Sequence, residues 1–335
     1  MKAMLFCAGI GSRLSPITDL VPKPMVDFFG CPLVDYTLSQ LEGWGITELV
    51  VNLHHRPEVL RQRLESRWGN AFNLHLSEEE YLLGTGGGLK EVERLFRGLT
   101  SLVANGDIIL DLSVDIEQML EMHYKNCAAA TLLLTESKTD KYTPIQVDEK
   151  GRISMLGSLF GGHNPDRPRY AYCGLQILEP AIFRFIPPGK PSSVITAVVE
   201  MLRSGLSVRG FILDGYWREL GDLDGYKEAH WDVLDGKSPY RAVVEESERF
   251  AFIQDRHESF DLNDFGIAFG TGVGIEPPVA LGRSCTIGKD THVGPYAVIG
   301  ESVRIGEQAE VTRSVLWRGA RVPHGARLRE TIIYQ

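Results

Sequence analysis

Residues 3–24 read AMLFCAGIGSRLSPITDLVPKP, an apolar run, then a glycine loop, then a lysine between two prolines. The apolar run over residues 3–7 predicts a β-strand. Glycines directly after a strand let backbone N–H groups approach a phosphate closely, because no Cβ intervenes. This stretch therefore predicts an α/β sheet with a phosphate-binding loop at the end of its first strand.

Two common glycine-loop motifs do not fit this loop. A dinucleotide-binding fingerprint needs a third glycine where the chain has Leu14. A Walker P-loop needs Gly-Lys-Ser/Thr, and this tripeptide does not occur in the region. The loop is therefore of another kind, and its nearest cations are Arg13 and Lys23.

Downstream of the loop, short apolar runs alternate with helical patterns. The predicted strands cover residues 48–52, 74–76, 102–105, 128–134, 146–147 and 171–177, and the predicted helices cover residues 32–43, 57–68, 88–96 and 222–234. This alternation predicts βαβ units in a Rossmann-like, mostly parallel sheet with helices on both faces. We expect the later strands to be partly antiparallel.

The C-terminal part of the chain carries a six-residue repeat. Its glycines, each preceded by an aliphatic residue, are Gly282, Gly288, Gly294, Gly300 and Gly306. This period predicts a small parallel β-helix in which the aliphatic column points inward and the glycines turn the corners. After Arg313 the register slips, as expected of a terminal coil. The predicted organisation is an α/β domain over residues 1–235, a connector over 236–275 and the β-helix over 276–335.

Composition excludes several classes of partner. The chain of 335 residues has 35 Lys and Arg against 44 Asp and Glu, a net charge of -9, which argues against binding to a nucleic-acid backbone. No apolar stretch is long enough to cross a bilayer, and the N-terminus lacks signal-peptide features, so no membrane partner is expected. Five scattered cysteines without C-x-x-C spacing predict a reducing, cytoplasmic location.

The glycine loop resembles that of a known enzyme family. Gly-x-Gly-Ser-Arg-Leu-x-Pro at residues 9–16, with Thr18 and then Pro-Lys-Pro at 22–24, is similar to the signature of nucleoside-diphosphate-sugar pyrophosphorylases, or sugar-1-phosphate nucleotidylyltransferases. Further motifs that resemble the family are Val-Asn-Leu-His-His at 51–55, Leu-Gly-Thr-Gly-Gly-Gly at 83–88, Asn-Gly-Asp at 105–107, Tyr-Ala-Tyr-Cys-Gly at 170–174 and Trp-Arg-Glu-Leu-Gly at 217–221. The repeat domain resembles the left-handed β-helix of many sugar-nucleotide enzymes and acyltransferases.

This resemblance covers residues 1–235 and implies a nucleotide-diphospho-sugar transferase fold. It also implies an enzyme that joins a nucleoside triphosphate to a sugar 1-phosphate and releases pyrophosphate. The implied catalytic residues are Arg13 and Lys23, and the implied nucleotide-binding residues are Ala8, Gly9, Gly11, Ser12, Arg13, Glu79, Gly84, Thr85 and Gly86. The implied sugar-binding residues are Asn105, Tyr172 and Gly174, and Asp107 and Glu219 would hold Mg²⁺.

Two departures from the family pattern bear on the substrate. The usual Glu-Lys-Pro near the sugar is missing from residues 155–165, and the expected aspartate of the last motif is Glu219. Residues 51–55 and the β-helix favour guanylyl transfer to mannose 1-phosphate. The Pro-Lys-Pro neighbourhood, the triple glycine and the missing Glu-Lys-Pro favour uridylyl transfer to an N-acetylmuramate or other hexose 1-phosphate. The first is the main prediction, and the second stays open.

Two other classes are alternatives. One is a hexapeptide-repeat acyltransferase, for which His292 and His324 are the candidate histidines, and the other is a non-catalytic regulator that binds sugar nucleotides. We expect the β-helix to assemble a homo-oligomer rather than to catalyse a reaction. On that interpretation, a chain ending after Gly236 keeps measurable activity.

Overall fold

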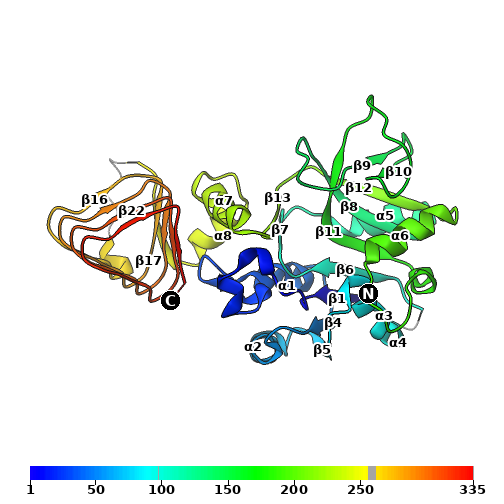
Figure 1. The fold of residues 1–335 in the computed structure, drawn as a ribbon, viewed down its shortest axis with the longest axis horizontal. Helices are drawn as coiled ribbons and strands as arrows, with labels where there is room; N and C mark the ends of the chain where they lie inside the picture. The colour runs from blue at the N-terminus through cyan, green and yellow to red at the C-terminus, as the bar shows by residue number, and fades with distance from the viewer. Residues whose placement is uncertain (97, 256–261, 335) are drawn as a thin grey trace. The chain divides into compact units, whose positions relative to one another are not determined.

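The computed structural model describes residues 1–96, 98–255 and 262–334. The chain divides into two compact units (Figure 1). The first unit comprises Met1–Val26 and Leu33–Glu219, and the second comprises Asp27–Pro32 and Leu220–Gln335. Six residues from near the N-terminus therefore belong to the C-terminal unit.

The first unit alternates strands and helices along most of its length. Its elements are β1 (Lys2–Phe6), η1 (Ser12–Leu14), η2 (Ile17–Asp19), η3 (Lys23–Met25), α1 (Leu33–Gly43), β4 (Glu48–Leu53), α2 (Pro57–Arg63), η4 (Leu64–Trp68), β5 (Asn73–Glu78), α3 (Gly84–Glu91), α4 (Glu93–Phe96), β6 (Ser101–Asn105), β7 (Ile108–Leu110), α5 (Ile116–Lys125), β8 (Ala130–Glu136), β9 (Ile145–Val147), β10 (Ile153–Leu156), β11 (Tyr170–Leu178), η5 (Pro180–Phe185), α6 (Val194–Arg203), β12 (Val208–Leu213) and β13 (Trp217–Glu219).

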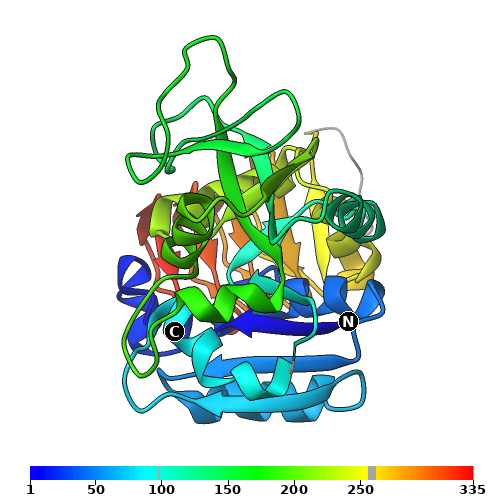
Figure 2. The same cartoon turned by 90° about the vertical axis from the view of Figure 1, so that its right-hand side faces the viewer.

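The main sheet of this unit has nine strands, in the order β10-β9-β11-β6-β1-β4-β5, with β8 joined to β11 and β12. Strand β1 pairs in parallel with β4 and β6, and β4 pairs in parallel with β5. Strand β11 is antiparallel to β6 and β8. Figure 2 shows β1, in dark blue, with β4 and β5 on one side. The predicted mostly parallel sheet with antiparallel later strands is confirmed.

Both faces of this sheet are buried. Along β1, Ala3 and Leu5 belong to the hydrophobic cluster that includes residues of α1, whereas Met4 belongs to the cluster that includes residues of α3 and α6. Successive side chains of a strand point to opposite faces, so a continuous apolar run is the expected sequence of a strand between two helical layers. The apolar stretch at the start of the chain fits this arrangement.

The second unit contains a short hairpin, two helices and the repeat domain. Its elements are β2 (Asp27–Phe28), β3 (Cys31–Pro32), α7 (Leu223–Leu234), α8 (Tyr240–Glu246), β14 (Phe250–Ile253), η6 (Leu262–Phe265), β15 (Ala268–Phe269), β16 (Gly274–Ile275), β17 (Val279–Gly282), β18 (Thr286–Ile287), β19 (His292–Val293), β20 (Ala297–Ile299), β21 (Arg304–Ile305), β22 (Glu310–Thr312), β23 (Val315–Leu316), β24 (Arg321–Val322), β25 (Arg327–Arg329) and β26 (Ile332–Ile333).

The repeat domain is a parallel β-helix, as predicted. Its strands form three stacked sheets, which are parallel except for the first pair, β14 with β17. The aliphatic column, from Leu281 to Val311, is buried. Partners lie 18 positions apart in β18 and β21, where Thr286 pairs with Arg304, but 17 apart in β21 and β24, where Arg304 pairs with Arg321. The predicted slip of register is therefore a shortening from 18 to 17 residues per coil, which occurs between Val298 and Val315 and again between Val315 and Ile332.

The role predicted for the repeat glycines is wrong in one respect. The residues with positive φ at the corners follow the glycines by two positions, as at Ser284 and Asp290. A Cβ at Gly282 would lie 2.5 Å from the backbone nitrogen of Glu301, in the next coil. Four of the five glycines are therefore required by the close approach of successive coils rather than by the turns themselves, whereas Gly294 also has a positive φ of +107°.

The hairpin β2–β3 packs into an aromatic cluster of the second unit. The ring of Phe29 stacks on His230 at 4.9 Å between centroids and meets Phe250 edge-on at 5.4 Å. Phe28 also contacts His230, at 4.6 Å. Phe252 lies 6.0 Å from Phe29. The hairpin thus brings two aromatic side chains into the core of the C-terminal unit.

Polar groups inside this cluster are held in fixed pairs. Tyr226 donates its hydroxyl hydrogen to the backbone oxygen of Asp27 and accepts a hydrogen bond from Trp317 Nε1 at 2.8 Å. His230 Nδ1 lies 2.9 Å from the backbone oxygen of Tyr226, so this nitrogen carries the hydrogen. Burial lowers the pKa of His230 to about 4. The histidine is therefore a neutral member of the core at pH 7.

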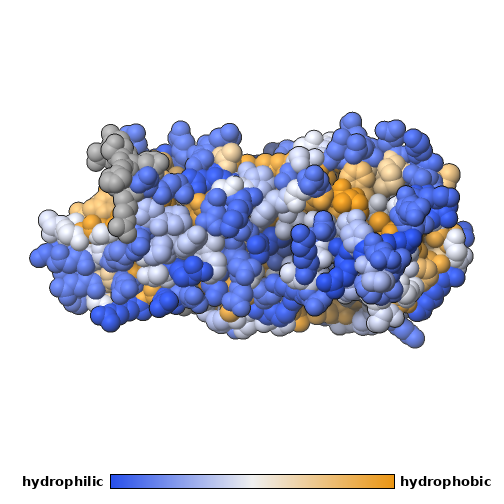
Figure 3. Space-filling model, turned by 90° about the horizontal axis from the view of Figure 1, so that it is seen from above, coloured by the Kyte–Doolittle hydropathy of each residue, from blue (hydrophilic) through white to orange (hydrophobic). Residues whose placement is uncertain are grey.

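The surface and the cysteines agree with the composition. The face drawn in Figure 3 is mostly hydrophilic, with separate hydrophobic patches. Among the helices of the described residues, none has the length and apolar character to span a membrane. All five cysteines lie within the described residues and none of them forms a disulfide bond there, and Cys127 is exposed.

Candidate functional site

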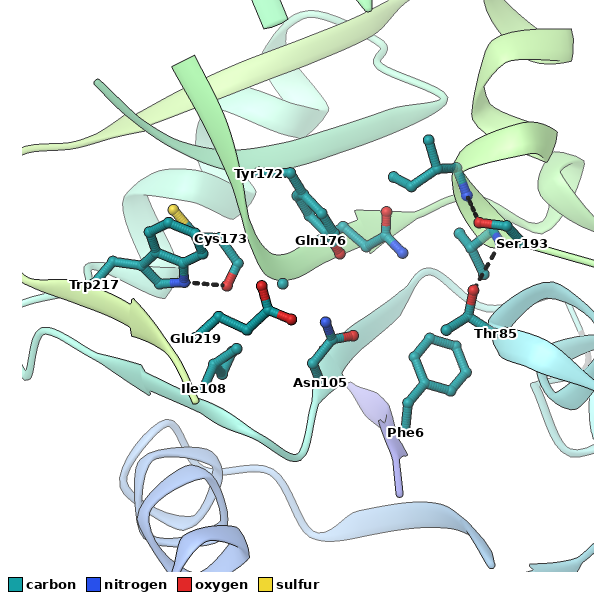
Figure 4. Close-up of a pocket in the computed structure, with 13 residues that line it drawn as sticks. Phe6, Thr85, Asn105, Ile108, Tyr172, Cys173, Gln176, Ser193, Trp217 and Glu219 are labelled. Carbon is teal, nitrogen blue, oxygen red and sulfur yellow. Dashed lines mark hydrogen bonds between the residues drawn. The ribbon is translucent and has the colours of Figure 1, made fainter. Parts of the chain in front are cut away.

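The carboxyl ends of two neighbouring parallel strands border a small pocket. Phe6 ends β1 and Asn105 ends β6, and both line the pocket, whose volume is about 260 Å³ (Figure 4). The other lining residues are Thr85, Ile108, Tyr172, Cys173, Gly174, Gln176, Ser193, Val194, Ile195, Trp217 and Glu219. Ligands of open α/β sheets bind beyond the carboxyl ends of the strands, which is where this pocket lies.

The two carboxylates predicted to hold a metal come together through strand pairing. Strand β13 pairs with β7, and Glu219 lies opposite Ile108. Asp107 directly precedes Ile108, so the turn after β6 brings it next to Glu219. Burial raises the pKa of the Glu219 carboxyl above its ordinary value, and the charge of Asp107 adds to the rise. Asp107 and Glu219 lie far apart in the sequence, and the pairing of β13 with β7 brings them close together.

Each carboxylate has a cation beside it. Lys23 Nζ forms a salt bridge and hydrogen bond with Asp107 Oδ2, and both side chains are largely buried. Arg13 Nη2 lies 3.7 Å from Glu219 Oε1, and 65% of the Arg13 side chain is exposed. The structure therefore brings together the four charged residues that the sequence singled out. Arg13 is accessible to a ligand, and Lys23 is held in place.

The first glycine loop packs against the lysine. Gly11 has φ +71°, and a Cβ there would lie 3.0 Å from both Lys23 Cβ and Thr18 Cγ2. Thr18 Oγ1 donates to the backbone oxygen of Gly11 at 3.0 Å. Ala8 is buried, whereas Gly9 and Ser12 are exposed. The loop thus positions Lys23 while leaving Gly9 and Ser12 accessible to a ligand.

The second glycine run is helical rather than a loop. Helix α3 begins at Gly84, so Thr85 and Gly86 belong to its first turn. A Cβ at Gly84 would lie 2.6 Å from the backbone oxygen of Ser192, and one at Gly86 would lie 2.7 Å from Ser192 Oγ. These glycines are therefore needed for packing against the segment before α6. Thr85 lines the pocket, and its Oγ1 accepts a hydrogen bond from the Val194 backbone at 3.0 Å.

Glu79 is buried, and both of its carboxylate oxygens have partners in the chain. Oε1 accepts from Asn52 Nδ2 at 2.7 Å, and Oε2 accepts from the backbone N–H of Leu83 at 2.9 Å. Asn52 Oδ1 in turn accepts from the Cys7 backbone at 2.8 Å. Glu79 thus connects the ends of β4 and β1 to the start of α3. Its direct contact with a nucleotide stays a prediction.

The three predicted sugar-binding residues line the pocket together. Asn105 lies on β6, and Tyr172 and Gly174 lie on β11. Gly174 has φ +82°, and a Cβ there would lie 3.0 Å from Asn105 Nδ2. Burial raises the pKa of the Tyr172 hydroxyl, which therefore stays protonated and can donate a hydrogen bond. Residues 155–165 do not contribute to the lining.

Sequence reasoning missed several residues at the site. Gln176 lines the pocket two positions after Gly174, and strand alternation could have indicated it. Ser193 also lines the pocket, but no motif marks it. The Tyr142 ring lies 4.8 Å from that of Trp217, in a loop that carried no signal. The charge of the adjacent Lys141 opposes the rise in the Glu219 pKa, so this loop brings a further cation toward the site.

The adjacent histidines after β4 do not form a metal site. His54 Nδ1 lies 2.8 Å from the Glu79 backbone oxygen, and His55 Nε2 lies 2.9 Å from that of Thr18. Across residues 1–96, 98–255 and 262–334, no group of three or more His, Cys, Asp or Glu side chains could hold a metal ion. Any ion at the site therefore takes at most two carboxylates from the described part of the chain.

The sequence comparisons with known proteins agree with one another on the family. Residues 2–236 match the nucleotidyl transferase family. The mannose-1-phosphate guanylyltransferase of Mycobacterium tuberculosis is 27% identical over 298 residues, which cover 88% of this chain and 78% of that protein. Mannose-1-phosphate guanylyltransferase 1 of Arabidopsis thaliana is 24% identical, over 99% of this chain and 86% of that protein.

Solved structures show the same fold. A putative glucose-1-phosphate thymidylyltransferase from Bacillus anthracis superposes with a TM-score of 0.60 at 20% sequence identity. The superposition covers 68% of this chain and 93% of that chain.

Proposed function

Since the chain belongs to the nucleotidyl transferase family, we propose that it joins a nucleoside triphosphate to a sugar 1-phosphate. The relatives named as mannose-1-phosphate guanylyltransferases support GTP and mannose 1-phosphate as the substrates. One observation carries the proposal: two cation–carboxylate pairs, Lys23 with Asp107 and Arg13 with Glu219, meet beside a small pocket.

The reaction needs charge compensation more than proton transfer. An oxygen of the sugar 1-phosphate attacks the α-phosphorus and forms a new P–O bond, while the bond to the bridging oxygen of the β-phosphate breaks and pyrophosphate leaves. The second pKa of a phosphate is about 6, so the nucleophile is already ionised at pH 7 and requires no general base. The protein must therefore hold two polyanions in line and neutralise the charge that moves to the leaving group.

The residues of the site fit these tasks. Lys23 is fixed by its contacts and would bind the α-phosphate or the sugar phosphate. Arg13 is exposed and would bind the β- and γ-phosphates. Backbone N–H groups of Gly9, Gly11 and Ser12 would contact the triphosphate.

Asp107 and Glu219 supply the donor set that magnesium prefers. They are adjacent carboxylates, and Mg²⁺ in proteins commonly takes one or two carboxylates together with substrate phosphates and water. When bound there, Mg²⁺ would neutralise charge on the phosphate oxygens. The glutamate is one methylene longer than the family's aspartate and lies at the end of β13, beside Asp107.

We expect Glu219→Gln to raise the Mg²⁺ concentration for half-maximal turnover by at least about tenfold, because the variant lacks a charged ligand. Glu219→Asp keeps the charge and is expected to show a smaller shift. The measurement is pyrophosphate release against Mg²⁺ concentration. Glu78→Gln is a matched control, since Glu78 also pairs with an arginine, Arg61, but lies outside the pocket. An unchanged Mg²⁺ dependence of Glu219→Gln would show that this carboxylate does not hold the ion.

The pocket lining supports a neutral sugar over N-acetylmuramate. Glu219 is the one charged side chain among the described residues that line it. The lining itself offers no cation to the carboxylate of N-acetylmuramate, because Arg13 and Lys23 lie beside the pocket and are already paired with Glu219 and Asp107. The missing Glu-Lys-Pro therefore does not by itself favour uridylyl transfer to that sugar.

The test of the function is a substrate grid. Pyrophosphate release is measured with ATP, GTP, CTP, UTP and dTTP against mannose, glucose, N-acetylglucosamine and N-acetylmuramate 1-phosphates. We expect the highest kcat/KM for GTP with mannose 1-phosphate. A maximum for UTP with another sugar would replace the specific assignment by the alternative, and no release with any pair would contradict transferase activity.

Two further parts of the proposal rest on the sequence pattern. A cytoplasmic location agrees with five cysteines that form no disulfide bond within the described residues. A homo-oligomer assembled through the β-helix agrees with the open strands of its last coil, β24 to β26. Sedimentation of the full chain tests the second part.

A further inference from the structure

A buried polar atom in the pocket lacks a partner. Gln176 is 1% exposed, and its Oε1 has no hydrogen-bond partner within the described residues. A buried acceptor without a donor costs about 1–3 kcal/mol of stability. Gln176 lies in the main sheet, where an apolar side chain would avoid that cost. The amide therefore needs an explanation beyond folding.

The backbone of β11 directs this side chain into the pocket. The register between β11 and β8 shifts between Tyr172 and Gln176, on either side of Gly174. Figure 4 shows Tyr172 and Gln176 on one side of the pocket, with Asn105 and Glu219 on the opposite side. The amide thus faces the same space as the predicted sugar-binding residues.

The hydroxyl groups of Thr85 and Ser193, which also line the pocket, are already engaged. Thr85 Oγ1 accepts from the Val194 backbone at 3.0 Å, and Ser193 Oγ accepts from the Ile195 backbone at 3.2 Å. The indole of Trp217 donates to the Cys173 backbone oxygen at 2.9 Å. Asn105 and Tyr172 also offer neutral polar groups to the pocket, but Gln176 Oε1 is the lining atom that is buried without a partner within the described residues. A ligand group that completes it must be a donor.

We propose that Gln176 is a specificity-determining residue, and that its Oε1 accepts a hydrogen bond from a ring hydroxyl of the sugar 1-phosphate. This inference rests on the proposed function, because it takes the pocket to be the sugar subsite. A site built to bond a hydroxyl discriminates against the analogue that lacks it, since the buried acceptor is then left unpaired. The substrate class is a hexose 1-phosphate with a free hydroxyl at the position facing β11.

The test compares Gln176→Met with the wild-type protein on a set of monodeoxy sugar 1-phosphates. Methionine has a similar length and no amide acceptor. We expect Gln176→Met to raise the KM for the parent sugar 1-phosphate roughly tenfold, with the KM for the triphosphate unchanged. We also expect the wild type to disfavour one deoxy analogue by a similar factor, and Gln176→Met to treat that analogue and the parent alike.

The melting temperature of the variants distinguishes a ligand-binding role of Gln176 from a structural one. Removing an unpaired buried acceptor is expected to leave the melting temperature unchanged or higher, whereas losing a structural residue lowers it. Ser207→Ala is the matched control, because Ser207 Oγ is also buried without a described partner but Ser207 does not line the pocket. This variant is expected to leave both KM values unchanged. Gln176→Leu serves if the methionine variant does not fold.

Two results would overturn the proposal. One is a wild type that penalises none of the deoxy analogues, and the other is a Gln176 variant with the wild-type pattern across all of them. The assay uses whichever sugar 1-phosphate the wild type prefers, so a different sugar in the grid contradicts the proposed function alone. If no pyrophosphate is released, the same comparison is made from the melting-temperature shift that each sugar 1-phosphate produces.

Discussion

Replacing Lys23 by alanine is expected to lower kcat by roughly 10²–10³-fold, the usual effect of removing a preorganised charge-stabilising contact. Lys23 is buried, paired with Asp107 and packed against Gly11, so its ammonium group is already in place before substrate binds. The loss should appear in pyrophosphate release at saturating substrates. Near-normal turnover of a folded variant would contradict the assignment.

Two further variants make this result specific. Lys2→Ala is the matched control, because Lys2 is also partly buried and paired, with Glu48 at 3.3 Å, but lies at the opposite end of β1. It is expected to retain kcat.

Arg13→Ala is expected to lose activity without loss of stability, since the side chain is exposed. The sequence predicts unchanged stability for Lys23→Ala as well, but the structure leads us to expect a lower melting temperature, because Asp107 would lose its partner.

A chain that ends after Gly236 is expected to aggregate and to lose most of its turnover. This truncation removes Phe250 and Phe252, against which Phe29 packs, and leaves an aromatic hairpin exposed. The hairpin directly follows the segment that carries Lys23. If the hairpin loses its packing, that segment is expected to become mobile. The structure therefore opposes the expectation that the C-terminal part is dispensable for activity. Turnover and light scattering of the truncated chain give the measurement.

Point variants in the full chain separate loss of the hairpin contacts from loss of the β-helix. Phe29→Ala is expected to destabilise the C-terminal unit by about 3–5 kcal/mol, the cost of deleting a buried phenylalanine. Phe269→Ala is the control, because Phe269 lies in the same unit but is 37% exposed. Wild-type melting of Phe29→Ala, together with an active, monodisperse truncated chain, would show that the hairpin needs no C-terminal support.

The fold was predictable where one local pattern determines the structure. The apolar run at residues 3–7 is buried on both faces, and the six-residue period corresponds to one side of a coil. The details that failed depend on neighbours distant in sequence. Nothing local shows that Gly282 is needed because the backbone of Glu301 passes close by. Likewise, nothing local shows that a Cβ at Gly84 or Gly86 would meet Ser192, more than 100 positions later in the chain.

The site was predictable to the extent that its residues lie in motifs. Arg13, Lys23, Asp107 and Glu219 are found together because the segment after β1, the turn after β6 and the β13–β7 pair meet at one place. Gln176 was not predicted, because it is a single glutamine inside an apolar strand and belongs to no motif. Its significance appears only when its missing partner is known.

The hairpin of residues 27–32 also has a consequence for how the chain folds during synthesis. Arg249 Nη1 donates to the backbone oxygen of Gly30 across 219 positions of the chain, at 3.0 Å. Phe28 and Phe29 leave the ribosome long before α7 and β14, and they have no native core to enter until those elements follow. Contacts of such high sequence separation form late, and apolar surface that waits for them is prone to aggregation. The N-terminal unit can thus complete its sheet first, while the hairpin, which belongs to the C-terminal unit, waits for elements that are translated only after that sheet.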